Sequence, residues 1–106
     1  MGVADAASAA STVLQGLDKV TARISTFEVP LDGTVRFGKL LVTALACNKR
    51  PPEEPPESAA YLIIQDTTAP TSPPPRVFEG WMFASSPALS ALEHPVYDIW
   101  VLDCKS

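Results

Sequence analysis

The sequence has few cationic residues, and this restricts the partners that the protein can bind. Its 106 residues include 8 lysines and arginines against 12 aspartates and glutamates, which gives a net charge of −4. Binding to phosphate backbones needs a cationic surface, so nucleic acid is not an expected partner. An acidic surface is also a poor match for anionic lipid headgroups.

Long apolar runs and targeting features are also missing. No apolar run approaches the roughly 20 residues that span a bilayer, so we expect no direct membrane insertion. The first residues, MGVADAASAASTVLQG, have neither the basic region nor the apolar core of a signal peptide. They fit either a mature exported protein with a replacement initiator Met1 or a cytosolic start. Because their apolar residues form no stripe for a helix to bury, we predict a poorly ordered leader over residues 1–16 and a single β domain over residues 17–106.

Cysteine is scarce, and the two that occur are Cys47 and Cys104. They lack the close spacing of a metal site, and each stands at the end of an expected strand. A disulfide between them is the simplest interpretation, and its constraint on the unfolded chain would be worth roughly 4 kcal/mol. Two buried, unpaired thiols of a cytosolic protein are the other interpretation, and the spacing leaves both open.

Helical periodicity is nearly absent, and the chain beyond residue 17 alternates as strands do. LDKVTARISTFEVP, residues 17–30, changes phase once, which predicts one strand with a bulge near Ser25 and Thr26. A turn at Asp32-Gly33 follows, and residues 40–47 are apolar on both faces, as in the central strand of a sheet. Three more strands are expected at residues 61–66, 76–83 and 96–104.

Both tryptophans and the only histidine lie in GWMFASSPALSALEHPVYDIWVLDC, residues 80–104. Ser86 followed by Pro87 is a helix-start pattern, so we predict one short helical crossover near residues 87–93. The flanking segments then read as strands that bury their tryptophans in the core. The pattern as a whole predicts an all-β fold, a compact antiparallel sandwich or a partly open barrel.

The last expected strand has a further consequence for its side chains. Because side chains alternate along a strand, we predict that Trp100, Leu102 and Cys104 share one face.

This same segment offers only weak candidates for catalysis. Ser85, Ser86 or Ser90 with His94 and Asp98 would supply a nucleophile, a base and an orienting carboxylate, but nothing resembles a nucleophile elbow. Serines at helix starts usually cap, and acidic residues that alternate with apolar ones usually mark a solvated strand face. The carboxylates considered for acid catalysis are Asp66, Glu79, Asp98 and Asp103. With one imidazole and no ligand repeat, we expect no metal site, no cofactor and no enzyme.

The proline-rich segment KRPPEEPPE is a stronger candidate for binding. We expect it to be an extended polyproline II loop, which would lose little chain entropy when a partner docks on it. A solvated loop kept stiff for stability is the alternative interpretation. The candidate contact residues here are Arg50, Glu53, Glu54 and Glu57.

A second candidate surface is the run from Trp81 through Met82 to Phe83. If these residues alternate through a sheet, at least one large side chain faces away from the core. Trp81 and Phe83 are therefore the second set of candidate partner contacts.

Four segments of the sequence resemble a known family: DKVTARISTFEVP, VRFGKLLVTALAC, KRPPEEPPESAA and GWMFASSPALSALEHPVYDIWVLDC. The family consists of small exported alphaproteobacterial proteins that carry a domain of unknown function. The resemblance covers nearly everything from Leu17 to Cys104. It implies export by a signal peptide ahead of this domain, a periplasmic location and a Cys47–Cys104 disulfide. It implies no catalytic residues.

These observations together lead to a functional expectation. We expect a non-enzymatic interaction domain of the periplasm or cell envelope, which contacts an envelope protein through the proline-glutamate loop or the aromatic strand. The alternative is a β domain for a small apolar ligand or lipid, with a cavity lined by residues such as Trp81, Phe83 and Trp100. The oligomeric state is left open.

Overall fold

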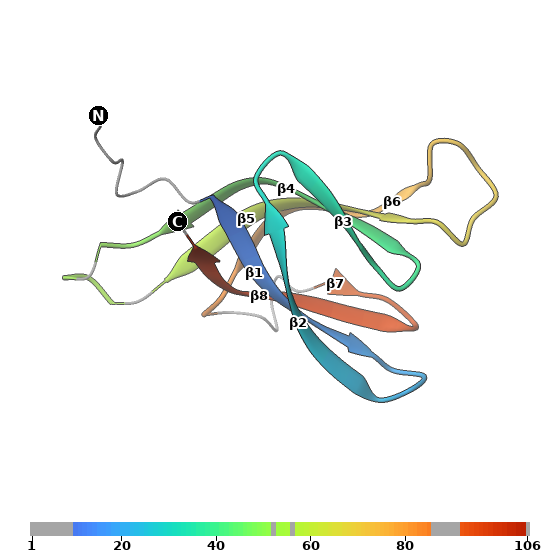
Figure 1. Ribbon diagram of the computed structural model, residues 1–106, viewed down its shortest axis with the longest axis horizontal. Coiled ribbons are helices and arrows are strands. Elements are labelled where there is room, and N and C mark those ends of the chain that lie inside the picture. The colour runs from blue at the N-terminus through green and yellow to red at the C-terminus, as the bar shows by residue number, and fades with distance from the viewer. Residues whose placement is uncertain (1–9, 52, 56, 86–91, 106) are drawn as a thin grey trace.

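The computed structural model is a sandwich of two four-stranded antiparallel sheets, ordered β2-β1-β8-β7 and β3-β4-β5-β6 (Figure 1). It describes residues 10–51, 53–55, 57–85 and 92–105. The strands are β1 (Ser11–Asp18), β2 (Arg23–Pro30), β3 (Gly33–Phe37), β4 (Leu40–Lys49), β5 (Ser58–Asp66), β6 (Arg76–Phe83), β7 (Leu92–Glu93) and β8 (Tyr97–Lys105). The predicted all-β fold is confirmed in its sandwich form, because the two sheets keep separate hydrogen-bonded ladders.

The first strand corrects the predicted leader. Residues 11–16 belong to β1, which lies between β2 and β8. Its inward positions are Thr12, Leu14 and Gly16, of which only Leu14 is large and apolar. This strand was missed because its buried face is built from small residues that carry little hydrophobic signal. Residues 1–9 of the predicted leader lie outside the described residues.

The predicted single strand over residues 17–30 is wrong, because a hairpin turn divides it. The Asp18 carboxylate accepts hydrogen bonds from the N–H groups of Val20 (2.9 Å) and Thr21 (3.2 Å). Ala22 then takes a left-handed φ of 58°, and the chain returns as β2. An aspartate that bonds to the backbone two residues on is a standard turn device, and it prevails here over the apolar alternation.

The next predicted turn is confirmed, and the central strand is placed as expected. Asp32 has a φ of 63°, and its N–H donates to Ala44 (2.7 Å). At this corner the chain crosses from one sheet to the other. A further turn at Gly38, with a φ of 59°, separates β3 from β4, and β4 lies between β3 and β5.

A bulge in β4 and another in β8 set which side chains face the core. The β4–β5 register skips Leu45, and the β1–β8 register skips Leu102. These two leucines are 43% and 40% exposed. Each bulge reverses the alternation, so the cysteine two residues later turns inward. The prediction that Trp100 and Leu102 share a face with Cys104 is therefore wrong, since Cys104 is buried on the same side as Val101.

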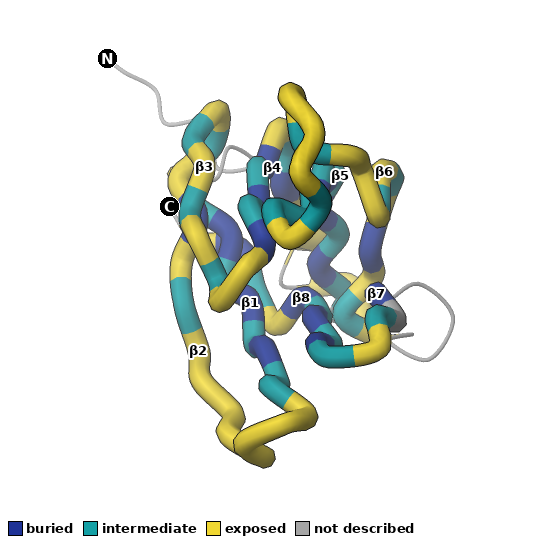
Figure 2. Tube along the Cα trace, turned by 90° about the vertical axis from the view of Figure 1, so that its right-hand side faces the viewer, coloured by how far each residue is buried: buried dark blue, intermediate teal, exposed yellow. Residues whose placement is uncertain are grey.

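The buried residues form one core cluster contributed by both sheets, and in Figure 2 the buried stretches lie on strands of both sheets, whereas β2 is largely exposed. A group of aromatic rings continues it beside the β3–β4 turn, where Phe27 stacks on Phe37 (5.1 Å between ring centroids) and Tyr97 packs edge-on against Phe37 (5.6 Å). Gly16 makes room for this stack, because an added Cβ there would overlap the Phe37 ring. The largest fully buried apolar side chains are Leu14, Val29, Leu40, Val42, Leu62, Ile64, Met82, Ile99 and Val101.

The predicted helical crossover near residues 87–93 falls mainly on residues 86–91, which lie outside the described residues. Its last two residues, Leu92 and Glu93, form the short strand β7 instead of a helical turn. They pair with Ile99 and Asp98 of β8. Pairing to a neighbouring strand supplies backbone hydrogen bonds that an isolated helical turn would lack.

Candidate functional site

A groove lies at one end of the sandwich, where the β4–β5 connection, the end of β6 and the last part of β8 meet. Its volume is about 650 Å³. The lining mixes charged, polar and apolar side chains from these three segments of the chain. They are Lys49, Arg50, Pro51, Glu54, Glu57, Ser58, Ala84, Ser85, Leu102 and Asp103.

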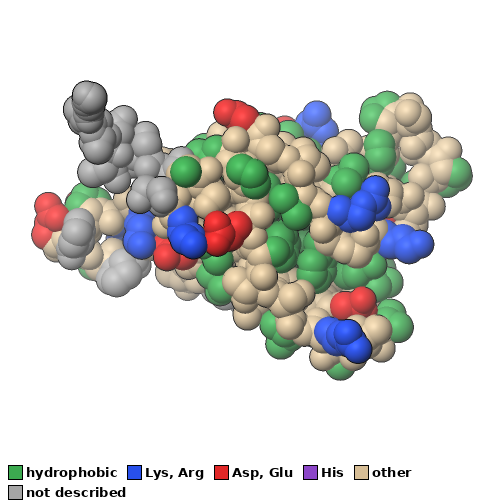
Figure 3. All heavy atoms as spheres, in the orientation of Figure 1, with side chains coloured by type: hydrophobic (Ala, Val, Ile, Leu, Met, Phe, Trp, Pro, Cys, Tyr) green, Lys and Arg blue, Asp and Glu red, His purple; other side chains and the backbone are tan. Residues whose placement is uncertain are grey.

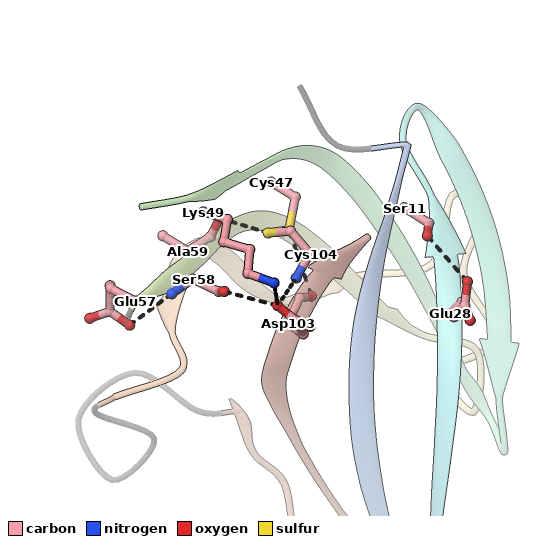
Figure 4. The surroundings of a disulfide bond; sticks show 9 residues. All are labelled: Ser11, Glu28, Cys47, Lys49, Glu57, Ser58, Ala59, Asp103 and Cys104. Carbon is pink, nitrogen blue, oxygen red and sulfur yellow. Dashed lines mark hydrogen bonds and ion pairs between the residues drawn. A yellow bond between two sulfur atoms is a disulfide. The ribbon is translucent and has the colours of Figure 1, made fainter. Parts of the chain in front are cut away.

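The Cys47–Cys104 disulfide lies beside this groove and joins β4 of one sheet to β8 of the other (Figure 4). The two Cα atoms are 5.8 Å apart, and both cysteines are buried. The predicted pairing is therefore confirmed. Covalent attachment of the sheets at this end fixes the distance between the two walls of the groove.

The proline-rich connection from residue 50 to residue 57 is not an extended polyproline II segment as predicted. The Arg50 N–H donates to the Glu57 carbonyl (3.0 Å), and the Glu54 N–H donates to the Pro51 carbonyl (3.0 Å). Proline has no N–H, but the non-proline residues keep theirs, and those donors close a hairpin end. The connection projects beyond the sheets in Figure 1 and carries Arg50, Glu53 and Glu54 on its exposed surface.

Glu57, one of the predicted partner contacts, is hydrogen-bonded within the domain. Its carboxylate accepts hydrogen bonds from the N–H of Ser58 (3.0 Å) and the N–H of Ser85 (3.1 Å), and also from the Ser85 hydroxyl. The Ser85 hydroxyl is the main reason why the pKa of Glu57 is lowered. Glu57 therefore fastens the β4–β5 connection to the end of β6, and its carboxylate is already occupied.

Asp103, one of the residues that line the groove, contacts several backbone and side-chain groups near the disulfide (Figure 4). It accepts hydrogen bonds from the Cys104 N–H (2.8 Å) and the Ser58 hydroxyl (3.4 Å), and it forms an ion pair with Lys49 (3.0 Å). Burial raises the pKa of Asp103, but Lys49 and these hydrogen bonds together outweigh it, so the pKa is lowered. Two charged side chains of the groove lining, Lys49 and Asp103, are therefore already paired with each other.

Trp81 and Phe83 lie on a different surface from the groove. They alternate with buried Met82 along β6 and are each 41% exposed on the outer face of the β3-β4-β5-β6 sheet. Trp81 packs edge-on against Tyr61 of β5, with 5.5 Å between ring centroids. The structure therefore brings Arg50, Glu54 and Glu57 together at the groove but does not bring the two aromatic residues to it.

His94 forms a polar pair that the sequence reasoning missed. Its Nε2 lies 2.8 Å from the Asp66 carboxylate, and its Nδ1 accepts a hydrogen bond from the Val96 N–H (3.0 Å). Because Nδ1 accepts, the Nε2–H group donates the hydrogen bond to the Asp66 carboxylate. Hydrogen bonds from the hydroxyl and N–H of Thr68, followed by the one from His94, lower the pKa of Asp66 from 3.8 to about 2. Local sequence patterns gave no sign of this pair, because it joins the end of β5 to the connection between β7 and β8.

The triad considered from the sequence is not assembled in the part of the chain that the structure describes. Asp98 forms an ion pair with Lys19 (3.0 Å) rather than with His94, and the Ser85 hydroxyl donates to Glu57. Ser86 and Ser90 lie outside the described residues. Within those same limits, no cluster of three or more histidine, cysteine, aspartate or glutamate side chains is arranged to hold a metal ion.

The surface in Figure 3 shows lysine, arginine and acidic side chains in small mixed groups rather than in one basic field. The described residues contain no helix with the length and apolarity needed to cross a membrane.

Comparison with known proteins shows the family of this chain. An uncharacterized protein of Rickettsia prowazekii (strain Madrid E) is 52% identical over 31 residues, which is 29% of this chain and 20% of the relative. The chain thus aligns with only about a fifth of that protein's length. No solved structure matches the chain. A family model described as "Uncharacterized protein conserved in bacteria (DUF2155)" matches residues 12–104. Because this match covers both sheets of the sandwich, the chain belongs to the DUF2155 family.

Proposed function

We propose that this domain is a non-enzymatic interaction domain of the bacterial cell envelope and that it binds a protein partner at the groove. The observation that carries the proposal is the groove itself, which lies under a projecting, proline-stiffened connection. The exposed charges of that connection, Arg50, Glu53 and Glu54, lie at or beside the opening. A stiff connection that keeps its shape before and after binding loses little conformational entropy on docking.

The disulfide supports the envelope location in this proposal. Disulfides persist in oxidising compartments such as the bacterial periplasm and are rare in the cytosol. Cys47 and Cys104 are buried and bonded to each other, and the described residues include no free cysteine. A structural bond of this kind is what an exported small domain uses to supplement a modest core.

The alternative of an apolar ligand or lipid has less support from the structure. Trp81 and Phe83 lie on the outer face of a sheet, so they do not line an interior cavity with Trp100.

The test is capture of partners from crosslinked envelopes with the tagged, natively exported protein, identified by mass spectrometry. The variant is Glu53→Gln with Glu54→Gln, and it leaves Glu57 in place because Glu57 holds Ser85. The matched control is Glu28→Gln with Glu79→Gln, which removes the same charge from other exposed strands. A partner lost only with the first pair supports the proposal, and capture that neither pair changes contradicts it.

A further inference from the structure

The β1–β2 hairpin carries two branched apolar side chains out of the core. Val20 in its turn is 78% exposed and Ile24 near the start of β2 is 60% exposed, the two highest values among the large apolar side chains of the described residues. The hairpin projects away from the β3-β4-β5-β6 sheet in Figure 1, and β2 is exposed over most of its length in Figure 2. Packing within the domain therefore does not account for these side chains.

The turn that carries Val20 is held in one shape by the chain itself. The Asp18 carboxylate binds two N–H groups of the turn. The Lys19 N–H donates to the Val96 carbonyl (2.8 Å), and the Lys19 Nζ donates to the His94 carbonyl (2.8 Å). These bonds tie the turn to the connection between β7 and β8. Because the turn is preformed, the apolar side chains lose little conformational entropy on docking.

The β3–β4 turn lies at the same end of the sandwich. Its Lys39 N–H donates to the Tyr97 hydroxyl (3.2 Å), and Tyr97 is paired with Asp18 in the β1–β8 register. Both turns point to the same side in Figure 1. We call these two turns and the β7–β8 connection the turn end. The groove is at the opposite end, since its lining includes Lys49 and Asp103 at the far ends of β4 and β8.

The described carboxylates of the turn end are bound within the domain. Asp18 accepts from the backbone of its own turn. Asp98 forms an ion pair with Lys19 (3.0 Å). Asp66 accepts a hydrogen bond from His94 (2.8 Å), and its side chain is only 14% exposed. These anions are therefore satisfied by groups of the protein.

Cations, in contrast, point outward at this end. Arg23 at the start of β2 and Lys39 in the β3–β4 turn are both exposed. Figure 3 shows cationic side chains beside hydrophobic ones on the projecting hairpin. The net charge of −4 therefore does not describe the turn end, which combines exposed apolar groups with outward cations. This combination is complementary to a surface that is apolar inside and anionic outside.

We propose that the turn end docks on an anionic lipid surface, with Val20 and Ile24 among the upper acyl carbons and with Arg23 and Lys39 at the lipid phosphates. Such contact is interfacial and needs no membrane-spanning segment. A convex apolar tip with cations behind it matches the order of layers in a bilayer, and anionic lipid attracts those cations. The inference goes beyond the proposed function, because it uses the end of the domain opposite to the groove.

The probe is a vesicle of phosphatidylglycerol and phosphatidylethanolamine, and vesicles of phosphatidylcholine serve as the neutral comparison. We measure how the intact oxidised protein partitions between vesicles and solution by co-flotation. We expect partition to be about tenfold stronger with the anionic vesicles. The difference should shrink when the salt is raised from about 0.1 M to about 1 M, because salt screens exposed charges.

Two pairs of substitutions separate the apolar contact from a general effect of exposed leucines. Val20→Ser with Ile24→Ser should weaken partition about tenfold, because both apolar contacts are lost. The matched control is Leu45→Ser with Leu102→Ser, which removes side chains that are 43% and 40% exposed elsewhere on the domain. The control should change partition less than about twofold. Circular dichroism checks that all variants are folded.

A further pair tests the role of charge at the turn end. Arg23→Gln with Lys39→Gln should weaken partition about tenfold on the anionic vesicles and leave it unchanged on phosphatidylcholine. The matched control is Arg50→Gln with Lys105→Gln, which removes the same charge from the opposite end and should have little effect.

Location is tested on the unaltered protein, so it does not depend on any variant folding. A gadolinium-chelating lipid in nanodiscs of the anionic composition should broaden the NMR signals of the Val20 and Ile24 methyl groups. The Leu45 and Leu102 methyl groups should keep their line widths.

The outcomes distinguish this inference from the proposed function. No partition into anionic vesicles, equal partition into neutral ones, equal loss with the control pairs, or broadening away from the turn end overturns lipid docking. If the Val20 and Ile24 substitutions remove a protein from envelope capture and the purified protein does not bind vesicles, the tip contacts a protein instead. Capture that is insensitive to the Glu53 and Glu54 substitutions contradicts only the proposed function at the groove, because the vesicle assay contains no partner.

Discussion

Removal of the Cys47–Cys104 bond should lower the thermal stability of the domain by an amount set by the loop that the bond closes. The cysteines are 57 residues apart, and the chain-entropy relation for a loop of that length gives about 4 kcal/mol at 25 °C. For a domain of 106 residues, the entropy of unfolding near Tm is about 0.2 kcal/mol/K. The expected decrease in Tm is therefore about 20 °C.

The assay compares melting curves of the oxidised protein, the same protein in reductant, and the Cys47→Ala/Cys104→Ala variant. The variant should melt far below the oxidised protein and should not respond to reductant, which controls for effects of the reductant itself. A reduced protein that melts within about 5 °C of the oxidised form would refute the reasoning, because loop closure would then contribute little. Thiol counting by mass spectrometry on protein matured in its own compartment gives a second check, since two free thiols there contradict an envelope location.

Three further predictions follow from side chains outside the disulfide. The pKa of Asp66 is lowered to about 2 from 3.8, so the ionised carboxylate stabilises the folded state above pH 4, and this stabilisation is lost as the pH falls through 2. Urea titrations should therefore show about 1–2 kcal/mol of acid destabilisation that Asp66→Asn lacks. Gly16→Ala should destabilise by about 1–3 kcal/mol because its Cβ overlaps Phe37, and adding Phe37→Leu should recover part of the loss in calorimetry. Glu57→Ala should lower Tm by releasing Ser85, whereas Glu53→Ala should leave Tm unchanged, and equal Tm values for the two variants would contradict the assigned role of Glu57.

Several strands could be predicted because they carry a strong apolar signal between proline-rich connections. The strand predicted over residues 76–83 has the same bounds in the structure, and those predicted over residues 61–66 and 96–104 lie within or close to β5 and β8. Strand β1 escaped prediction because two of its three inward residues, Thr12 and Gly16, are not large and apolar. Its place in the sheet is decided by its neighbours on both sides rather than by its own pattern.

Positions where the chain changes direction or phase were harder to predict. Val20 and Ala22 continue the alternation of a strand, yet Asp18 binds the backbone there and forms a turn. Leu45 and Leu102 stand in apolar runs, so nothing in the sequence marks either one as the extra residue of a bulge. A bulge is defined by pairing with another strand, and that partner is distant along the chain.

In the candidate site, too, features set by neighbouring residues could be predicted from the sequence, whereas contacts between distant residues could not. The sequence indicated the proline-glutamate connection as a surface feature, and Arg50, Glu53 and Glu54 are exposed there. Nothing in the sequence distinguished these exposed residues from Glu57, because the hydrogen-bond partner of Glu57, Ser85, is 28 residues away. The groove itself could not be predicted, because its walls come from segments that meet only when the two sheets pack.

The sequence by itself determined that the chain would form β-strands between proline-rich connections and that the two cysteines would stand at strand ends. Alternation of side chains and the geometry of proline act over a few residues, so they can be read from the order of amino acids. Tertiary structure decided the phase of each cysteine, the pairing of His94 with Asp66 and the groove at one end of the sandwich. These features depend on register and on contacts between distant strands, where a shift of one residue exchanges the buried and exposed faces.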